Sequence, residues 1–181
     1  VTGTLRAGTT ALRLALDAIA GGSAKEALVT ASDARVAAPR SDLDRALGDG
    51  AAALLVSDKD AIAEIEGSHT VTEHLMDVWR ASGEPFVRTW EERFVSEEGY
   101  LRIMDEAVQG ALKKFSIKPG DITKFVYTAL DSRRHADVGR KLGFSPQQIQ
   151  DPLFGRVGNT GAAFPLMLLI AALESARPGD R

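Results

Sequence analysis

An apolar helix begins within the segment Leu5-Arg6-Ala7-Gly8-Thr9-Thr10-Ala11-Leu12. From Thr9 to Ala20, apolar residues cover most of the helix surface, and Arg13 and Asp17 are the only charged residues. The pair Gly21-Gly22 follows, and glycine is the residue that most often ends a helix. Because a helix that is apolar nearly all round is buried on most sides, we predict a buried helix close to the beginning of the chain.

A second apolar helix is predicted from Ala162 to Ala176. It follows the small-residue turn Gly158-Asn159-Thr160-Gly161, and Pro178-Gly179 ends it. The first helix follows a comparable turn, Arg6-Ala7-Gly8-Thr9. Two buried helices that begin in the same way, one near each end of the chain, indicate two related halves.

Four short segments have the pattern of β-strands. Ala27–Ser32 and Ala51–Val56 are apolar runs bounded by turn formers, and such runs are typical of strands covered on both faces. Ile62–Glu66 alternates between apolar and polar residues, and Lys124–Thr128 follows a Pro-Gly-Asp turn. Because strands alternate with helices, we predict an α/β protein with layered, mostly parallel sheets.

The chain divides into three predicted parts. Residues 1–66 form the latter part of the first half. Residues 67–99 have an irregular pattern and contain both tryptophans, so they are predicted to be a connecting region. Residues 100–181 form an incomplete second half, with an amphipathic helix from Tyr100 to Phe115 and another from about Ser132 to Leu142.

The charge of the chain argues against two classes of partner. It has 22 basic and 25 acidic residues, scattered along the sequence, with a net charge of -3. We therefore expect neither nucleic acid nor a membrane surface as a partner. No apolar run reaches the roughly 18 residues that suggest a membrane span, and no signal peptide pattern is present, so a cytoplasmic location is expected. Neither end resembles a natural terminus, and we expect a chain truncated at both ends.

The chain contains no cysteine. This excludes disulfides, thiolate metal sites and thiol nucleophiles within these residues. His69 and His74 are five residues apart in the irregular region, which does not place them on one helical face as a zinc pair requires. No metal site is expected.

Four stretches, in order and with natural spacing, resemble one family. They are the segment 5–12; the glycine-rich strand entry Gly48-Asp49-Gly50-Ala51-Ala52-Ala53; Asp77-Val78-Trp79-Arg80 with Pro85, Arg93-Phe94 and Gly99-Tyr100; and 158–161 with the closing residues 176–181. The chain is similar to the thiolase superfamily, and within it to the archaeal and bacterial type of hydroxymethylglutaryl-CoA synthase, which is related to ketoacyl-ACP synthase III. The resemblance covers essentially the whole chain and implies a thiolase-like layered fold of two related halves.

The resemblance also implies a catalytic site in which two of three groups are replaced. In the family a cysteine at the head of the buried helix is acylated, and Leu5 occupies that position. Thr128 stands where the family has a histidine that polarises the thioester, and Asn159 matches the family's asparagine. A leucine has no nucleophilic atom, and a threonine hydroxyl is no general base near neutral pH. The family's acid/base glutamate falls outside this chain.

A coenzyme A thioester is the ligand that the resemblance implies. Asn159 would donate a hydrogen bond to the thioester carbonyl, between Gly158 and Gly161. Arg133 would meet phosphate groups of coenzyme A at the mouth of the pocket. Alternatively, Asn159 caps the following helix, and Arg133 belongs to a solvated helix surface. His135, on the same predicted helix, is expected on that solvated face.

Two functional hypotheses remain open. In the first, the chain is a thiolase-fold protein of this family that forms no acyl enzyme and serves as a partner or scaffold subunit. The resemblance implies a homodimer, or a heteromer with a thiolase-like subunit and an OB-fold, acyl-CoA-associated protein. In the second, it is an acyl-CoA transferase or condensing enzyme that works without a cysteine. A replacement role for Thr4 or Thr128 as nucleophile or acid is a further alternative.

Overall fold

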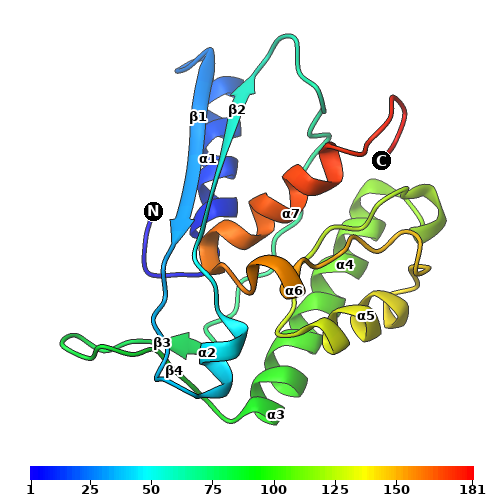
Figure 1. The fold of residues 1–181 in the computed structure, drawn as a ribbon. Coiled ribbons are helices and arrows are strands. Elements are labelled where there is room, and N and C mark those ends of the chain that lie inside the picture. The colour runs from blue at the N-terminus through cyan, green and yellow to red at the C-terminus, as the bar shows by residue number, and fades with distance from the viewer.

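The computed structural model describes the backbone of residues 1–181 and every side chain except that of Glu92. Figure 1 shows α1, β1, β2 and α7 side by side in one part of the molecule, with α4 and α5 together in another. The longer elements are α1 (Ala7–Ala20), β1 (Glu26–Asp33), β2 (Gly50–Ser57), α4 (Arg102–Phe115), α5 (Ser132–Lys141) and α7 (Phe164–Leu173). The shorter ones are α2 (Asp42–Ala46), β3 (Val78–Trp79), β4 (Arg88–Thr89), α3 (Glu92–Phe94), the π-helix η1 (Val95–Leu101), the 3-10 helices η2 (Pro119–Asp121) and η3 (Gly161–Ala163), and α6 (Phe154–Val157).

The strands pair in antiparallel fashion. β1 and β2 lie side by side over their full length, and β3 pairs with β4 in the same sense. Residues 34–49 carry the chain back from β1 to β2, and an antiparallel neighbour needs no long crossover. Within the described residues, parallel pairing is limited to the isolated bridges Leu47–Asn159 and Phe125–Ile149. The strand pairs of this chain are therefore antiparallel, whereas the sequence analysis predicted mostly parallel ones.

A first core lies on one face of the β1–β2 pair. Val29, Ala31 and Ala52 point to this face and are buried, because successive strand side chains alternate between faces. α1 and α7 cover this face, and Leu166 of α7 belongs to the same cluster. Most of the core-facing residues of α7 are almost fully buried, with Leu168 at 0% exposure. The predicted buried helix near the end of the chain is confirmed.

The opposite face of the β1–β2 pair is open to solvent. Leu28 and Leu55 face each other across the pair, and each is 67% exposed. In α1, Ala15 is buried against the sheet while Leu14 is 54% exposed. The prediction that these strands are covered on both faces is therefore wrong for the part of the chain described, as is the prediction that α1 is buried nearly all round. α1 and α7 lie on the same side of the sheet, so they leave its other face uncovered.

A second core joins α4 and α5. Tyr127, Val138, Leu142 and Phe144 are buried there, and apolar residues of α4 pack against them. The rings of Phe144, Phe125, Tyr127 and His135 form a continuous stack, with neighbouring centroids 4.0 to 4.4 Å apart. The two helices predicted in this region are confirmed, with α4 beginning two residues later than predicted and preceded by the π-helix η1.

Two predicted strands do not form. Ile62–Glu66 is irregular and exposed, with Ile62 at 92% exposure. Lys124–Thr128 contributes only the bridge at Phe125. Alternation of apolar and polar residues in so short a segment does not supply a pairing partner, and a strand needs one for its backbone hydrogen bonds. The division into 1–66, 67–99 and 100–181 stays a prediction.

Two further properties concern the described residues only. None of their helices combines the length and the apolar character that crossing a bilayer requires. Nor do three or more histidine and acidic side chains gather among them in an arrangement suited to a metal ion.

Candidate functional site

The loop between α6 and η3 holds Asn159 against the chain that precedes β2. Gly158 ends α6 with a φ of 68°. The Asn159 N–H donates to the carbonyl oxygen of Ala46 at 2.8 Å, and the Gly48 N–H donates to the Asn159 carbonyl oxygen at 3.1 Å. Both backbone groups of Asn159 are thus fixed by a segment more than a hundred residues earlier. Gly48, the first residue of the glycine-rich strand entry, thus contacts the Asn159 loop directly.

The side chain of Asn159 has one end fixed and one end free. Its Oδ1 accepts hydrogen bonds from Arg35 Nη2 at 2.9 Å and from the Gly161 N–H at 3.0 Å. The first of these donors also reaches the Asn159 carbonyl oxygen, at 3.0 Å. Among the described residues, no hydrogen bond uses Nδ2 of Asn159. The oxygen therefore has the cap-like role that was one alternative, while the amide nitrogen remains available to a ligand.

Asp33 and Arg35 support this arrangement from the end of β1. Asp33 Oδ2 accepts a hydrogen bond from the Ala162 N–H at 3.0 Å and lies 3.6 Å from Arg35 Nε. Gly161 has a φ of 58°, and a Cβ there would lie 1.9 Å from the same carboxylate oxygen. Position 161 therefore requires glycine, both for its backbone conformation and for the space that Asp33 occupies.

Arg35 is a buried cation with incomplete hydrogen bonding. Its side chain is only 9% exposed, and its Nε and Nη1 are buried without a hydrogen-bond partner. Burial lowers the pKa of Arg35 from its ordinary value, while the charges of Asp33 and Asp77 raise it. Burial also raises the pKa of Asp77, against the opposing effects of Arg35 and a hydrogen bond from Thr89. The site thus contains a buried cation and two partly buried acids that interact with it.

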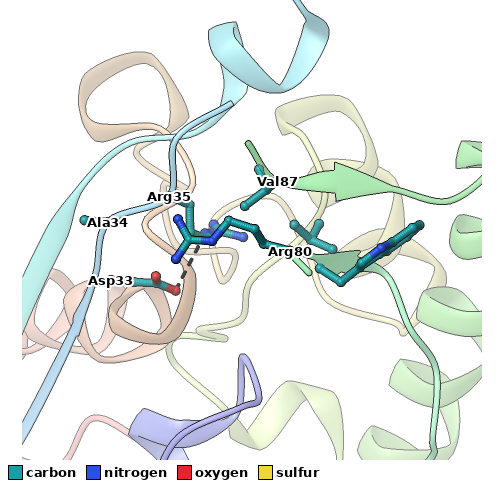
Figure 2. A pocket seen from close by; sticks show the side chains of 7 residues that line it. Asp33, Ala34, Arg35, Arg80 and Val87 are labelled. Carbon is teal, nitrogen blue, oxygen red and sulfur yellow. Dashed lines mark ion pairs between the residues drawn. The ribbon is translucent and has the colours of Figure 1, made fainter. Parts of the chain in front are cut away.

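Two cavities adjoin Arg35. The first measures about 250 Å³ and is lined by residues 33–35 together with Val78, Trp79, Arg80 and Val87. In Figure 2, Arg80 points across this cavity towards Arg35, and the Asp33 carboxylate lies on the other side of the guanidinium. The second, of about 280 Å³, is lined by residues 35–37, Asp44 and residues 47–49. Arg35, which holds Oδ1 of Asn159, lines both cavities.

Leu5 lies in the turn before α1 and is 38% exposed. Gly8, in the first turn of α1, packs against η3, the 3-10 helix that precedes α7. A Cβ on Gly8 would lie 2.5 Å from the Ala162 carbonyl oxygen. Leu5 lies three residues before Gly8, and Asn159 lies three residues before Ala162. The fold therefore brings the two segments that carry Leu5 and Asn159 together.

Thr128 and Arg133 are held by a different part of the fold. The Thr128 carbonyl oxygen accepts a hydrogen bond from Tyr100, and three residues later Asp131 caps α5 through the Arg134 N–H at 2.8 Å. Arg133 is exposed in the first turn of α5. No hydrogen bond within the described residues joins either one to the Asn159 loop. Their predicted roles in the site remain predictions.

The sequence analysis was wrong about His135 and missed Arg35. His135 is 1% exposed, with its ring stacked on Tyr127 at 4.1 Å and its Nε2 at 3.2 Å from the Tyr127 carbonyl oxygen. Burial lowers the pKa of His135. It lies on the face of α5 that carries Val138, and the charged residues around it in sequence point elsewhere. The sequence did contain a signal for Arg35. Polar residues directly follow the apolar run Ala27–Ser32, and polar residues at the end of a strand often lie at the edge of a site.

No protein-family model matches the chain. Among curated proteins, it is 32% identical over 177 residues to the hydroxymethylglutaryl-CoA synthase of Methanopyrus kandleri, covering 97% of this chain and 50% of that protein. It is also 32% identical over 178 residues to the enzyme of the same name from Aeropyrum pernix, covering 97% of this chain and 49% of that protein. The chain spans about half the length of the curated relatives it matches.

Solved structures share the fold. A crystal structure of 3-oxoacyl-(acyl-carrier-protein) synthase III from Aquifex aeolicus VF5 superposes with a TM-score of 0.82 at 23% identity, over 99% of this chain and 59% of that one. A crystal structure of HMG-CoA synthase complexed with CoA gives 0.80 at 19% identity, over 98% of this chain and 48% of that one. The layered α/β fold predicted from the sequence is confirmed.

Proposed function

The chain belongs to the hydroxymethylglutaryl-CoA synthase family of the thiolase superfamily, and from this premise we propose that it binds an acyl-CoA thioester without becoming acylated itself. The observation that carries the proposal is the leucine at position 5, in the turn before α1, in a chain that has no cysteine. A thioester is attacked by a group with a lone pair, which a hydrocarbon side chain lacks.

The residues around Asn159 suit a thioester carbonyl. Its free Nδ2 is a hydrogen-bond donor, and two cavities adjoin the residue that fixes its other end. A donor of this kind stabilises negative charge on a carbonyl oxygen. Coenzyme A would bring the thioester to this donor, with Gly158 and Gly161 shaping the loop around it. Arg133, exposed at the start of α5, would meet the phosphate groups.

We assign this protein a role as a non-acylating partner or scaffold subunit. Its partner would be a second copy, or a thiolase-like subunit together with an OB-fold, acyl-CoA-associated protein. Leu28 and Leu55, which face each other on the open sheet face, support an association, because apolar side chains exposed together mark interaction surfaces.

A second function is favoured by the charged groups beside the first cavity. Asp33, Arg35 and Asp77 place two acids and a cation close to the Asn159 loop, and burial raises the pKa of Asp77. A carboxyl group with a raised pKa is suited to proton transfer. In this alternative the chain is an acyltransferase or condensing enzyme that acts by direct addition or decarboxylation, without a covalent acyl intermediate.

Calorimetric titration with acetyl-CoA and acetoacetyl-CoA, followed by mass spectrometry of the denatured protein, tests the proposal. We expect binding, an unchanged protein mass and no release of free coenzyme A thiol. Thiol release with an unchanged mass would select the second function. An acyl group retained on the wild-type chain would overturn both. Asn159→Ala is the variant expected to weaken binding, and Arg93→Gln, in an exposed ion pair with Glu97, is its control.

A further inference from the structure

Arg35 and the Gly161 N–H determine which end of the Asn159 amide faces inward. Both groups are donors only, and both point at the same side-chain atom of Asn159. If the amide were rotated by half a turn, its NH2 group would meet these two donors, and two hydrogen bonds would be lost. The atom facing them is therefore the oxygen, and the nitrogen is the end presented to a ligand.

The buried position of Arg35 costs the fold free energy. Its Nη2 makes both hydrogen bonds to Asn159, while Nε and Nη1 have no hydrogen-bond partner although they are buried. Buried donors are rarely left unpaired, and each such group needs an explanation. Burying a charged residue also often fails to stabilise a fold, because removing the charge from water costs free energy. The contacts that Arg35 does complete are directed to Asn159, which indicates a role in orienting this residue.

Asp33 fixes the guanidinium in turn. The carboxylate forms an ion pair with Arg35 and accepts a hydrogen bond from the Ala162 N–H. It therefore joins the end of β1 to η3, the 3-10 helix before α7. The chain of contacts thus runs from Asp33 through Arg35 to Asn159. The positive charge beside Oδ1 also polarises the amide, which makes the Nδ2 hydrogens stronger donors.

We infer that Arg35 is a positioning residue that locks the Asn159 amide with Oδ1 inward, so that Nδ2 is the donor offered to the carbonyl oxygen of a bound thioester. The part of this inference that concerns the thioester rests on the proposed function. The locked orientation of the amide is a property of the protein alone and is tested separately.

The first test uses the free protein. The side-chain NH2 resonances of Asn159 are assigned by NMR through their absence from Asn159→Asp, and are then compared in wild type, Arg35→Met, Arg35→Lys and Arg93→Gln. In the wild type we expect two proton signals whose chemical shifts differ from those of a solvent-exposed asparagine amide. Because rotation about the amide C–N bond is slow, the two signals stay separate in every variant, and their shifts are the readout. Arg35→Met should move both signals towards the shifts of an exposed amide, and Arg35→Lys should give intermediate shifts. Unchanged signals in a folded Arg35→Met protein would overturn the inference.

The second test uses acetyl-CoA labelled with ¹³C at the thioester carbonyl. Isotope-edited infrared spectra should show the carbonyl stretch lowered on binding to the wild type and to Arg93→Gln, and returned towards its solution position in Arg35→Met. Asn159→Asp keeps an acceptor for Arg35 and Gly161 but has no Nδ2, so it should remain folded and lose the shift. A shift that survives in both variants would contradict the inference.

The two tests separate the two failures. If acetyl-CoA does not bind to the wild type, the proposed function fails while the NMR comparison still decides the role of Arg35. If Arg35→Met does not fold, Arg35→Lys carries the same comparison, because it keeps the charge and loses the planar guanidinium whose Nη2 reaches both oxygens of Asn159. Unchanged amide signals in Arg35→Lys would then overturn the inference.

Discussion

The Asn159 loop and the segment around Thr128 differ in how the fold holds them. Asn159 is fixed through its N–H, its carbonyl oxygen and its Oδ1. Thr128 is held through its carbonyl oxygen, and no hydrogen bond within the described residues uses its hydroxyl. The side chain that we expect to match the family's asparagine is thus tied into the structure through its Oδ1. Leu5, which is 38% exposed, and Thr128, whose hydroxyl makes no such bond, are the two positions expected to carry replaced side chains.

The largest effect is expected from Gly161→Ala. The added Cβ would collide with the Asp33 carboxylate, and alanine is disfavoured at a φ of 58°. We expect a loss of about 3 kcal/mol in the free energy of unfolding, measured by chemical denaturation. Gly155→Ala is the control, since a Cβ there meets nothing within 4 Å. Equal stability of the two variants would show that the Asn159 loop is not held as tightly as the contacts imply.

An intermediate effect should come from pH, through the aromatic stack near Thr128. Burial lowers the pKa of His135 in the folded protein, so the unfolded chain binds a proton at a higher pH than the folded one. The stabilisation that the neutral imidazole provides is complete above the pKa of the unfolded chain, about 6.5. It is lost as the pH falls towards the pKa of the folded protein, by no more than about 1.4 kcal/mol per pH unit. Asp151, whose pKa is lowered mainly by a hydrogen bond from the Leu153 N–H, acts at lower pH.

Denaturation curves of wild type and His135→Gln between pH 7.5 and pH 5 check this. The wild type should lose stability across this window, and the variant should lose less. A parallel decline in both proteins would assign the acid sensitivity to other groups.

The smallest effect is expected from Thr128→Val. This change removes a hydroxyl that makes no hydrogen bond among the described residues and keeps the shape of the side chain. The free energy of unfolding should change by no more than about 0.5 kcal/mol, and thioester binding should be unchanged. A large loss of binding would place Thr128 in the site beside Asn159 and would remove the contrast between the two regions.

The parts of the fold that sequence predicts best are those set by neighbouring residues. α4 and α5 follow from their apolar stripes, and β1 and β2 from apolar runs between turn formers. The exposed outer face of the β1–β2 pair was not predictable, because a run of small apolar residues does not show what covers it. The strand expected at Ile62–Glu66 failed for a related reason: alternation alone supplies no partner.

The site was predictable only in part because its contacts join distant residues. Asn159 was found through its turn and its resemblance to the family, but Arg35 acts on it across 124 positions of sequence. His135 lies among arginines and an aspartate, so the sequence predicted a solvated position. Only the packing of Tyr127 against α5 shows that the ring is buried.

The most direct test of a non-acylating site is to restore the missing nucleophile. Leu5→Cys places a thiol in the turn before α1, and Thr4→Cys places one a single residue earlier as a control. After incubation with acetyl-CoA, mass spectrometry of the denatured proteins should show one acetyl group on Leu5→Cys and none on Thr4→Cys or the wild type. Acetylation of the wild-type chain, or of the two cysteine variants alike, would contradict the assignment of position 5 as the lost acylation site.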